Sequence, residues 1–160
     1  LLKLLTTGNV TISADKNLAT FAIENAIFTT NLIEGSYPNY KQVIPAQAKH
    51  SLTIDRNLFL AAISRVALMT AEESKTLDIT IDDNKLTLHS ATNERGEATE
   101  SVNINFSGEK VKVNINPEYL SDAVRATDED EVTLNIISAT EPVVIKAGSK
   151  FTGVIMPQMV

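Results

Sequence analysis

The feature of this sequence that most restricts its fold is an internal repeat of one pattern of secondary structure. Residues 50–107 predict a strand, a helix and three further strands, and residues 110–157 predict the same five elements in the same order. Units repeated in this way bury their apolar faces against one another. The repeat therefore predicts an α+β domain in which two helices lie on one side of antiparallel sheets.

Apolar periodicity and turn residues place the elements of each copy. In the first copy, Asp55 is expected to cap a helix that runs to about Met69. In the second copy, Asn116 and Pro117 start a helix that ends near Ala126, because Asn is a favoured N-cap and Pro fits the first helical position. The predicted strands are Ser51–Ile54, Leu77–Ile81, Lys85–Ser90, Glu97–Phe106, Val111–Ile115, Glu131–Ile137, Val143–Ala147 and Lys150–Met156.

The beginning of the chain has the pattern of the back part of a further copy. Leu1–Leu5 predicts the end of an apolar helix, and the leading strand and most of that helix are missing. The three strands predicted after it are Val10–Ala14, Leu18–Glu24 and Ile27–Ile33. Since the first residue is Leu rather than Met, we expect a fragment or trimmed product, with an incomplete unit at residues 1–40 and a complete one at residues 41–160.

A proline-rich segment joins the two units. It has the sequence Leu-Ile-Glu-Gly-Ser-Tyr-Pro-Asn-Tyr-Lys-Gln-Val-Ile-Pro, at residues 32–45. Pro38 and Pro45 fix φ and remove backbone donors, so this connector cannot be the middle of a helix or of a central strand. It is predicted to be ordered and extended. Its predicted anchors are Tyr37, Tyr40, Val43 and Ile44.

Composition and motifs do not favour an enzyme. His50 and His89 lie in predicted strands without metal-like spacing to carboxylates, and the acidic pairs Glu72-Glu73 and Asp82-Asp83 lie in predicted turns. The sequence has no glycine-rich phosphate loop and no nucleophile elbow. Cys is absent, which excludes disulfides and cysteine metal sites and suits a cytoplasmic location. We expect no catalytic residue, no metal and no cofactor.

The remaining composition bounds the partners. No apolar run approaches the roughly 20 residues of a membrane span, so no membrane association is expected. The formal net charge is −6, whereas proteins that grip nucleic acid usually carry a basic surface.

Two stretches carry the pattern of a known family. The connector combines an acidic-glycine turn, an aromatic-proline pair, a tyrosine, a polar pair and an aliphatic-proline end. The chain then ends with an aliphatic pair, Met-Pro and a short apolar tail. The matching residues are Glu34-Gly35, Tyr37-Pro38, Tyr40, Lys41-Gln42, Ile44-Pro45 and Val154-Ile155-Met156-Pro157. With the repeated unit, these stretches resemble the bacterial sliding clamp, the beta subunit of DNA polymerase III; Met159 stands where that family often has a basic residue.

The resemblance implies a fold and a function. In that family each domain is two such units, three domains form a subunit, and two subunits close into a homodimeric ring around duplex DNA. Residues 1–40 would then be the C-terminal part of the second clamp domain, and residues 41–160 the third. The implied protein is a cytoplasmic processivity factor of DNA replication. It is a non-catalytic subunit of the DNA polymerase III holoenzyme that encircles DNA and need not grip it.

The resemblance also implies a cleft for Gln-Leu-x-Leu-Phe-like peptides. These peptides belong to the DNA polymerase III alpha subunit, the clamp loader, other polymerases and repair proteins. The cleft residues carried by this chain would be Pro38, Gln42, Val43, Asn116, Tyr119, Thr140, Pro142, Val154, Ile155, Met156, Pro157, Gln158, Met159 and Val160. The DNA-facing residues would be Arg56, Arg65 and Arg125. The subunit interface would contain Leu68, Met69, Glu97 and Glu100.

Alternatives remain open at this point. Asn116 is also a helix cap, the three arginines are also ordinary surface residues, and Leu68 and Met69 also suit core packing. As a whole, the chain could be a freestanding α+β peptide-binding module that does not encircle DNA. A metal-dependent hydrolase would have to use the acidic turns, such as Asp82-Asp83.

Overall fold

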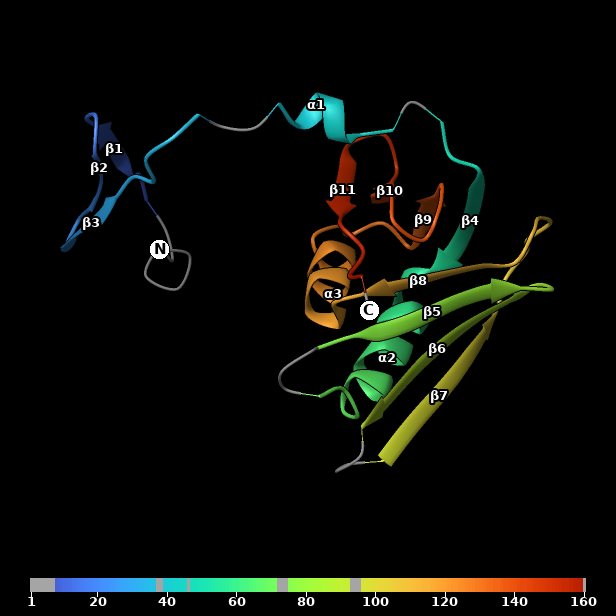
Figure 1. Cartoon of the computed structure of the whole chain (residues 1–160). Helices are drawn as coiled ribbons and strands as arrows, with labels where there is room; N and C mark the ends of the chain where they lie inside the picture. The colour runs from blue at the N-terminus through green and yellow to red at the C-terminus, as the bar shows by residue number, and fades with distance from the viewer. Residues whose placement is uncertain (1–7, 37–38, 46, 72–74, 93–95, 160) are drawn as a thin grey trace. The chain divides into compact units, whose positions relative to one another are not determined.

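The structure, a computed structural model, describes residues 8–36, 39–45, 47–71, 75–92 and 96–159. The chain divides into two compact units, residues 1–39 and residues 40–160, and each has its own sheet structure (Figure 1). The helix end predicted at Leu1–Leu5 lies outside the described residues.

The first unit is one antiparallel sheet. Its strands, in spatial order, are β1 (Thr11–Ala14), β2 (Leu18–Ile23) and β3 (Ala26–Asn31). Among the described residues of this unit only Ala19 is buried, and the Ile27 side chain is 76% exposed. The three predicted strands are present, but the described residues of this unit form no buried core.

A short helix interrupts the connector. α1 (Tyr40–Val43) forms a single turn, so the prediction of an extended connector is wrong at these four residues. Pro45 ends this helix without preventing a turn just before it, because a proline restricts mainly itself and the residue that precedes it. Of the predicted anchors, Tyr40 and Val43 are exposed, Ile44 is half-buried and Tyr37 lies outside the described residues.

The first half of the second unit has one helix and four strands. These are β4 (His50–Asp55), α2 (Arg56–Ala67), β5 (Leu77–Asp82), β6 (Lys85–Thr92) and β7 (Gly96–Asn103). Asp55 Oδ1 accepts a hydrogen bond from Leu58 N at 2.8 Å and so caps α2, as predicted.

Strand β7 is shorter than the strand predicted up to Phe106. Beyond its end, Ile104 N donates to Asn84 O at 2.9 Å and Phe106 N donates to Asn84 Oδ1 at 3.0 Å. The chain leaves the sheet because Asn84, in the β5–β6 turn, supplies these two acceptors. Asp83 and Asn84 have φ values of 44° and 59°, which is the geometry of the tight hairpin turn predicted there.

The second half repeats the element order of the first. Its elements are β8 (Val111–Ile115), α3 (Pro117–Arg125), β9 (Glu131–Ile136), β10 (Val143–Ala147) and β11 (Phe151–Ile155). The predicted repeat of strand, helix and three strands is therefore confirmed.

The first strand of each half pairs with the sheet of the other half. One sheet has the order β11-β10-β9-β4 and the other the order β7-β6-β5-β8, with antiparallel neighbours. His50 of β4 lies opposite Ile136 of β9, and Ile115 of β8 lies opposite Leu77 of β5. This exchange joins the two halves into one body.

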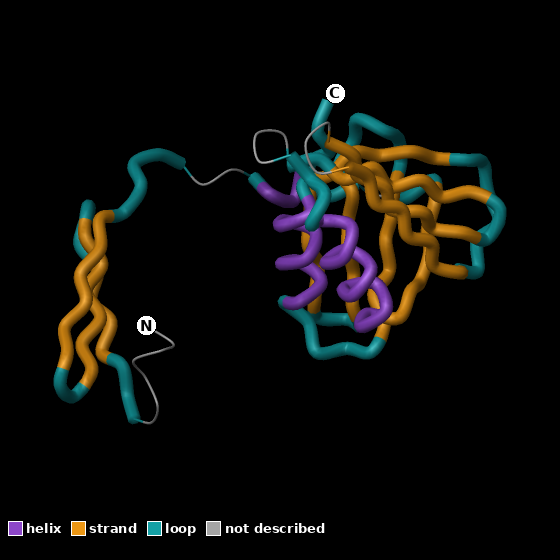
Figure 2. Tube along the Cα trace, turned by 90° about the horizontal axis from the view of Figure 1, so that it is seen from below, coloured by secondary structure: helices purple, strands orange, loops and turns teal. Residues whose placement is uncertain are grey.

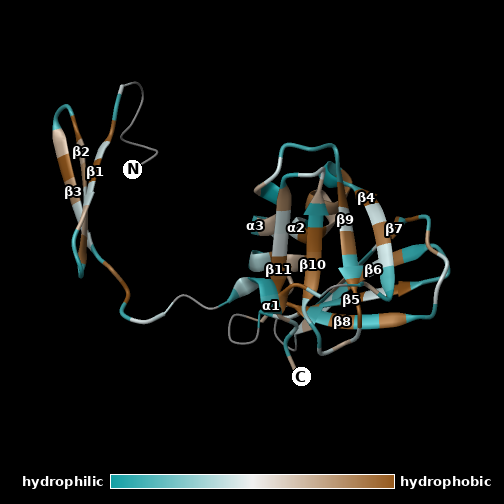
Figure 3. Ribbon diagram, turned by 90° about the horizontal axis from the view of Figure 1, so that it is seen from above, coloured by the Kyte–Doolittle hydropathy of each residue, from teal (hydrophilic) through white to brown (hydrophobic). Residues whose placement is uncertain are grey.

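The core lies between the helices and the two sheets. α2 and α3 pack against each other on one side of the strands (Figure 2). Phe59 and Ile63 of α2 and Leu120 of α3 are buried, and the strands alternate buried and more exposed residues, as in Leu77–Asp82. Figure 3 shows hydrophobic residues along β9 and β10, and Leu134 and Ile145 of these strands are buried. The predicted α+β arrangement is confirmed.

Candidate binding cleft

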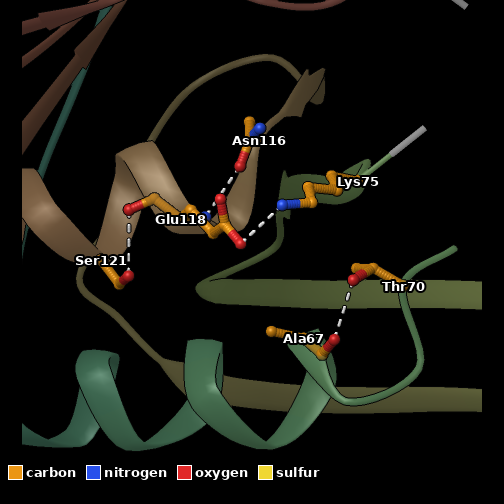
Figure 4. Close-up of polar contacts among 6 residues, drawn as sticks. All are labelled: Ala67, Thr70, Lys75, Asn116, Glu118 and Ser121. Atoms are coloured by element: carbon orange, nitrogen blue, oxygen red, sulfur yellow. Dashed lines mark hydrogen bonds and ion pairs between the residues drawn. The ribbon is translucent and has the colours of Figure 1, made fainter. Parts of the chain in front are cut away.

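Polar contacts fix the first turn of α3 (Figure 4). Asn116 is buried, and its Oδ1 accepts a hydrogen bond from Glu118 N at 2.9 Å. Ser121 Oγ donates to Glu118 O at 3.0 Å, and Lys75 Nζ forms an ion pair with Glu118 Oε1 at 2.8 Å. Asn116 is therefore the N-cap of α3. The next residue after Glu118 is Tyr119, whose side chain is 63% exposed.

An apolar groove of about 520 Å³ lies between α3 and β11. Its lining residues are Tyr119, Asp122, Ala123, Phe151, Gly153, Val154, Ile155 and Met156. A side chain at Gly153 would meet Ala123 Cβ at 3.5 Å and the Phe151 ring at 3.3 Å, so glycine keeps this part of the groove open. Met156 is 57% exposed. The groove offers apolar walls together with the Tyr119 hydroxyl and the Asp122 carboxylate, a composition that suits an extended apolar peptide.

The C-terminal tail, residues 156–159, borders a second cavity. Gln158 N donates to Asn114 O of β8 at 2.8 Å, and Thr76 Oγ1 donates to Gln158 Oε1 at 3.0 Å. This cavity has a volume of about 480 Å³. It is lined by Ala71, Thr76, Asp78, His89, Ser90, Ala91, Gln158 and Met159.

The predicted cleft residues divide into three groups. The first group lines the groove and contains Tyr119, Val154, Ile155 and Met156. The second group, Gln158 and Met159, lines the second cavity instead. Pro157 lies in the chain between the two groups and lines neither cavity. The others line neither cavity: Asn116 caps α3, Gln42 and Val43 are exposed in α1, and Thr140 and Pro142 lie before β10. Pro38 and Val160 lie outside the described residues.

Four groove residues were not predicted. Asp122 and Ala123 follow Tyr119 at helical spacing, which is a signal that the sequence contains. Phe151 and Gly153 alternate along β11, but only the packing of β11 against α3 shows which face of the strand is used.

Each of the three helix arginines has a partner within the chain, and for Arg125 that partner lies on its own helix. Arg56 Nε donates to Val124 O at 3.1 Å, which joins the start of α2 to the end of α3. Arg125 Nη1 lies 3.9 Å from Asp122 Oδ1. Each of these arginines thus has a partner within its own chain, and their orientation toward DNA stays a prediction.

Arg65 forms a two-pronged ion pair with Glu100 of β7. The Arg65 Nε and Nη2 atoms lie 2.6 and 2.8 Å from the two Glu100 carboxylate oxygens. The hydrogen bond from Arg65 lowers the pKa of Glu100, and the same bond raises the pKa of Arg65. A residue predicted to face DNA and one predicted to face a second subunit are thus paired with each other. Leu68 and Glu97 are exposed, and Met69 is half-buried.

The histidines and acidic turns have structural surroundings. His50 is buried against the Phe106 ring, with ring centroids 5.8 Å apart, and His89 Nδ1 lies 2.9 Å from Thr99 Oγ1. Asp82 pairs with Lys110 at 3.3 Å. Among the described residues no group of three metal-ligating side chains comes together, and none of the described helices is long and apolar enough to cross a membrane. Glu72-Glu73 lies outside the described residues.

Solved structures define the class of protein. The DNA polymerase III subunit beta of Pseudomonas aeruginosa superposes with a TM-score of 0.83 at 22% identity, over 99% of this chain and 45% of that chain. A sliding clamp of Bartonella birtlesii, solved bound to griselimycin, superposes with a TM-score of 0.82 at 25% identity, over 99% of this chain and 43% of that chain. The fold is therefore that of the sliding clamps.

Sequence relatives name the family. Residues 41–159 match the family described as DNA polymerase III beta subunit, C-terminal domain, and the chain belongs to this family. The beta sliding clamp of Rickettsia bellii is 32% identical over 132 residues, which are 77% of this chain and 35% of the relative. That of Caulobacter vibrioides is 34% identical over 102 residues, 64% of this chain and 27% of the relative. The chain thus spans about a third of the length of these relatives.

Proposed function

We propose that this chain is part of a sliding clamp, a non-catalytic processivity factor of DNA replication in the bacterial cytoplasm. The observation that carries the proposal is the exposed apolar groove between α3 and β11 in a chain of the DNA polymerase III beta family. In this proposal, residues 1–40 end the second clamp domain and residues 41–160 form the third.

The groove is proposed to receive short peptides of the replication machinery. The peptides are of the Gln-Leu-x-Leu-Phe type, from the DNA polymerase III alpha subunit, the clamp loader, other polymerases and repair proteins. Apolar peptide side chains would pack between Tyr119, Val154 and Met156, and the Tyr119 hydroxyl would orient the peptide. Large exposed aromatic and Met side chains at a concave site are typical anchors of such contacts.

The peptide site is tested by truncating its exposed aromatic wall. We expect Tyr119→Ala to weaken binding of a fluorescent Gln-Leu-x-Leu-Phe peptide by about 1–3 kcal/mol, the range of an interface hot spot. Deletion of residues 156–160 should weaken binding by a similar amount. Fluorescence anisotropy measures both, and the control is Leu58→Ala, which truncates an exposed apolar residue of α2 outside the groove. Equal affinity of Tyr119→Ala and the wild-type chain would remove the groove from the proposal.

The clamp is further proposed to hold DNA by encircling it as a homodimeric ring. Support comes from the charge balance: the formal net charge is −6, and the arginines of α2 and α3 contact their own chain. Tight phosphate binding would need a basic surface. A ring retains DNA topologically and does not need one.

The ring is tested with the full-length gene product. Loaded by its clamp loader, it should remain on closed circular DNA through gel filtration and be lost when one cut makes the DNA linear. Because sliding off an end does not depend on phosphate contacts, this loss should be similar at low and high salt. Retention on linear DNA at low salt alone would instead indicate a gripping mode and contradict the ring.

A further inference from the structure

The C-terminal tail forms the partition between two cavities. Met156 lines the groove beside α3, whereas Gln158 and Met159 line the cavity on the β5–β6 side. Two residues, Met156 and Pro157, span from one side to the other. The position of the groove wall therefore depends on how the chain is held at both ends of this short span.

Both ends of the span are fixed. On one side Ile155 is the last residue of β11, buried and paired opposite Val143. On the other side Gln158 is held through its backbone N–H by Asn114 and through its side chain by Thr76. Asn114 and Thr76 are themselves held by the sheet. Asn114 lies opposite Asp78 in the β8–β5 ladder, and Thr76 immediately precedes β5.

The oxygen atom of the Asn114 side chain contributes no hydrogen bond to the tail. This Oδ1 atom is buried and has no hydrogen-bond partner within the described residues. A buried acceptor without a partner opposes the folded arrangement rather than supporting it. Two bonds that do hold the tail are those of the Gln158 backbone N–H to Asn114 and of the Thr76 hydroxyl to Gln158.

We propose that Thr76 and Gln158 are positioning residues of the peptide groove. Their hydrogen bond seats the tail on β8 and so sets where Met156 stands in the groove, although neither residue lines the groove. This inference rests on the proposed function of the groove. It differs from the prediction that Gln158 contacts the peptide directly, because it makes peptide affinity depend on a bond on the far side of the tail.

The test removes the hydroxyl of Thr76 while keeping its shape. Thr76→Val takes away the donor to Gln158, and the matched control, Thr80→Val, makes the same change on the outer face of β5. Three quantities are measured on the full chain. They are amide hydrogen exchange at Gln158, the NMR position of the Met156 methyl group, and the affinity for a Gln-Leu-x-Leu-Phe peptide.

We expect Thr76→Val to speed exchange at the Gln158 amide, to shift the Met156 methyl signal, and to weaken peptide binding about two- to tenfold, the effect of one neutral hydrogen bond. Thr80→Val should change none of the three. Gln158→Ala also removes this bond, so it should change peptide affinity in the same direction as Thr76→Val.

The outcomes separate this inference from the proposed function. Unchanged Gln158 exchange in Thr76→Val overturns the tether. Faster exchange with an unmoved Met156 methyl, or with unchanged affinity, overturns the positioning role. If the wild-type chain binds no peptide, the proposed function of the groove fails, while the exchange and methyl measurements still decide whether Thr76 sets the position of Met156.

Discussion

At the scale of single residues, Asn116 joins fold and site. Asn116 Oδ1 accepts a hydrogen bond from Glu118 N, so Asn116 fixes where α3 starts. The start of the helix in turn sets the direction in which the Tyr119 side chain points. A cap of this kind stabilises the helix, because it satisfies one backbone donor that has no partner within the helix. The stability of the unit and the orientation of the groove wall therefore depend on the same side chain.

Removal of this cap should lower stability. We expect Asn116→Ala to reduce the free energy of unfolding by about 0.5–2 kcal/mol, the range measured for N-cap residues. Urea unfolding followed by circular dichroism measures it. Asn105→Ala is the control, because Asn105 is exposed and lies outside the helices and strands. Equal stability of Asn116→Ala and the wild-type chain would show that the cap contributes nothing.

Single residues also show what the sequence could predict about the site. Tyr119 and Met156 were identified through the resemblance of the start of α3 and of the C-terminal tail to the clamp family, and both line the groove. Thr76 could not be identified in this way. It lies far from Gln158 in the sequence, and a threonine before a strand carries no pattern that points to a distant glutamine.

At the scale of elements, the Arg65–Glu100 pair ties α2 to β7. Both oxygens of the carboxylate are engaged, so the pair fixes the orientation of the helix side chain against the outermost strand of its sheet. Sequence periodicity placed Arg65 on a helix and Glu100 on a strand but did not join them, because the pairing depends on the packing of α2 over β7.

This pair should make stability depend on acid pH. The pKa of Glu100 lies below its ordinary value of 4.5 because Arg65 donates to it. A carboxylate with a lowered folded-state pKa stabilises the fold above its unfolded pKa, and the contribution is lost as pH falls through the folded pKa. The stability difference between wild type and Glu100→Gln should therefore be present at neutral pH and shrink as the pH falls below 4.5.

Urea unfolding at several pH values measures this difference. The effect should be small, since exposed ion pairs contribute little. Glu97→Gln is the control, because Glu97 lies on the same strand and is exposed. The same stability difference at neutral and acid pH would contradict a role for Glu100 in acid sensitivity.

The connector shows the limit of element prediction. Its prolines correctly exclude a long helix, yet Tyr40–Val43 forms one turn. A single turn needs so few residues that proline spacing cannot exclude it, and its formation depends on local contacts. The long amphipathic elements were predictable for the opposite reason. Each buries one face, and the apolar residues of that face recur at a regular spacing in the sequence.

At the scale of the molecule, the two units differ in how much buried core stabilises their described residues. The described core lies almost entirely within residues 40–160, whereas the described part of the first unit buries only Ala19. We expect residues 40–160 expressed alone to unfold cooperatively with a dispersed NMR spectrum, and residues 1–39 alone to show no ordered sheet. Loss of cooperative unfolding on removal of residues 1–39 would show that the second unit needs the first.

The exchange of first strands has a consequence for synthesis. Since the chain emerges from the ribosome N-terminus first, β4 appears while its partner β9 has not yet been made, and β5 appears before its outer neighbour β8. The first half therefore cannot complete its folding before the second half is translated. The sheet of β4, β9, β10 and β11 can close only when nearly all of this unit has been released, so its two halves mature together.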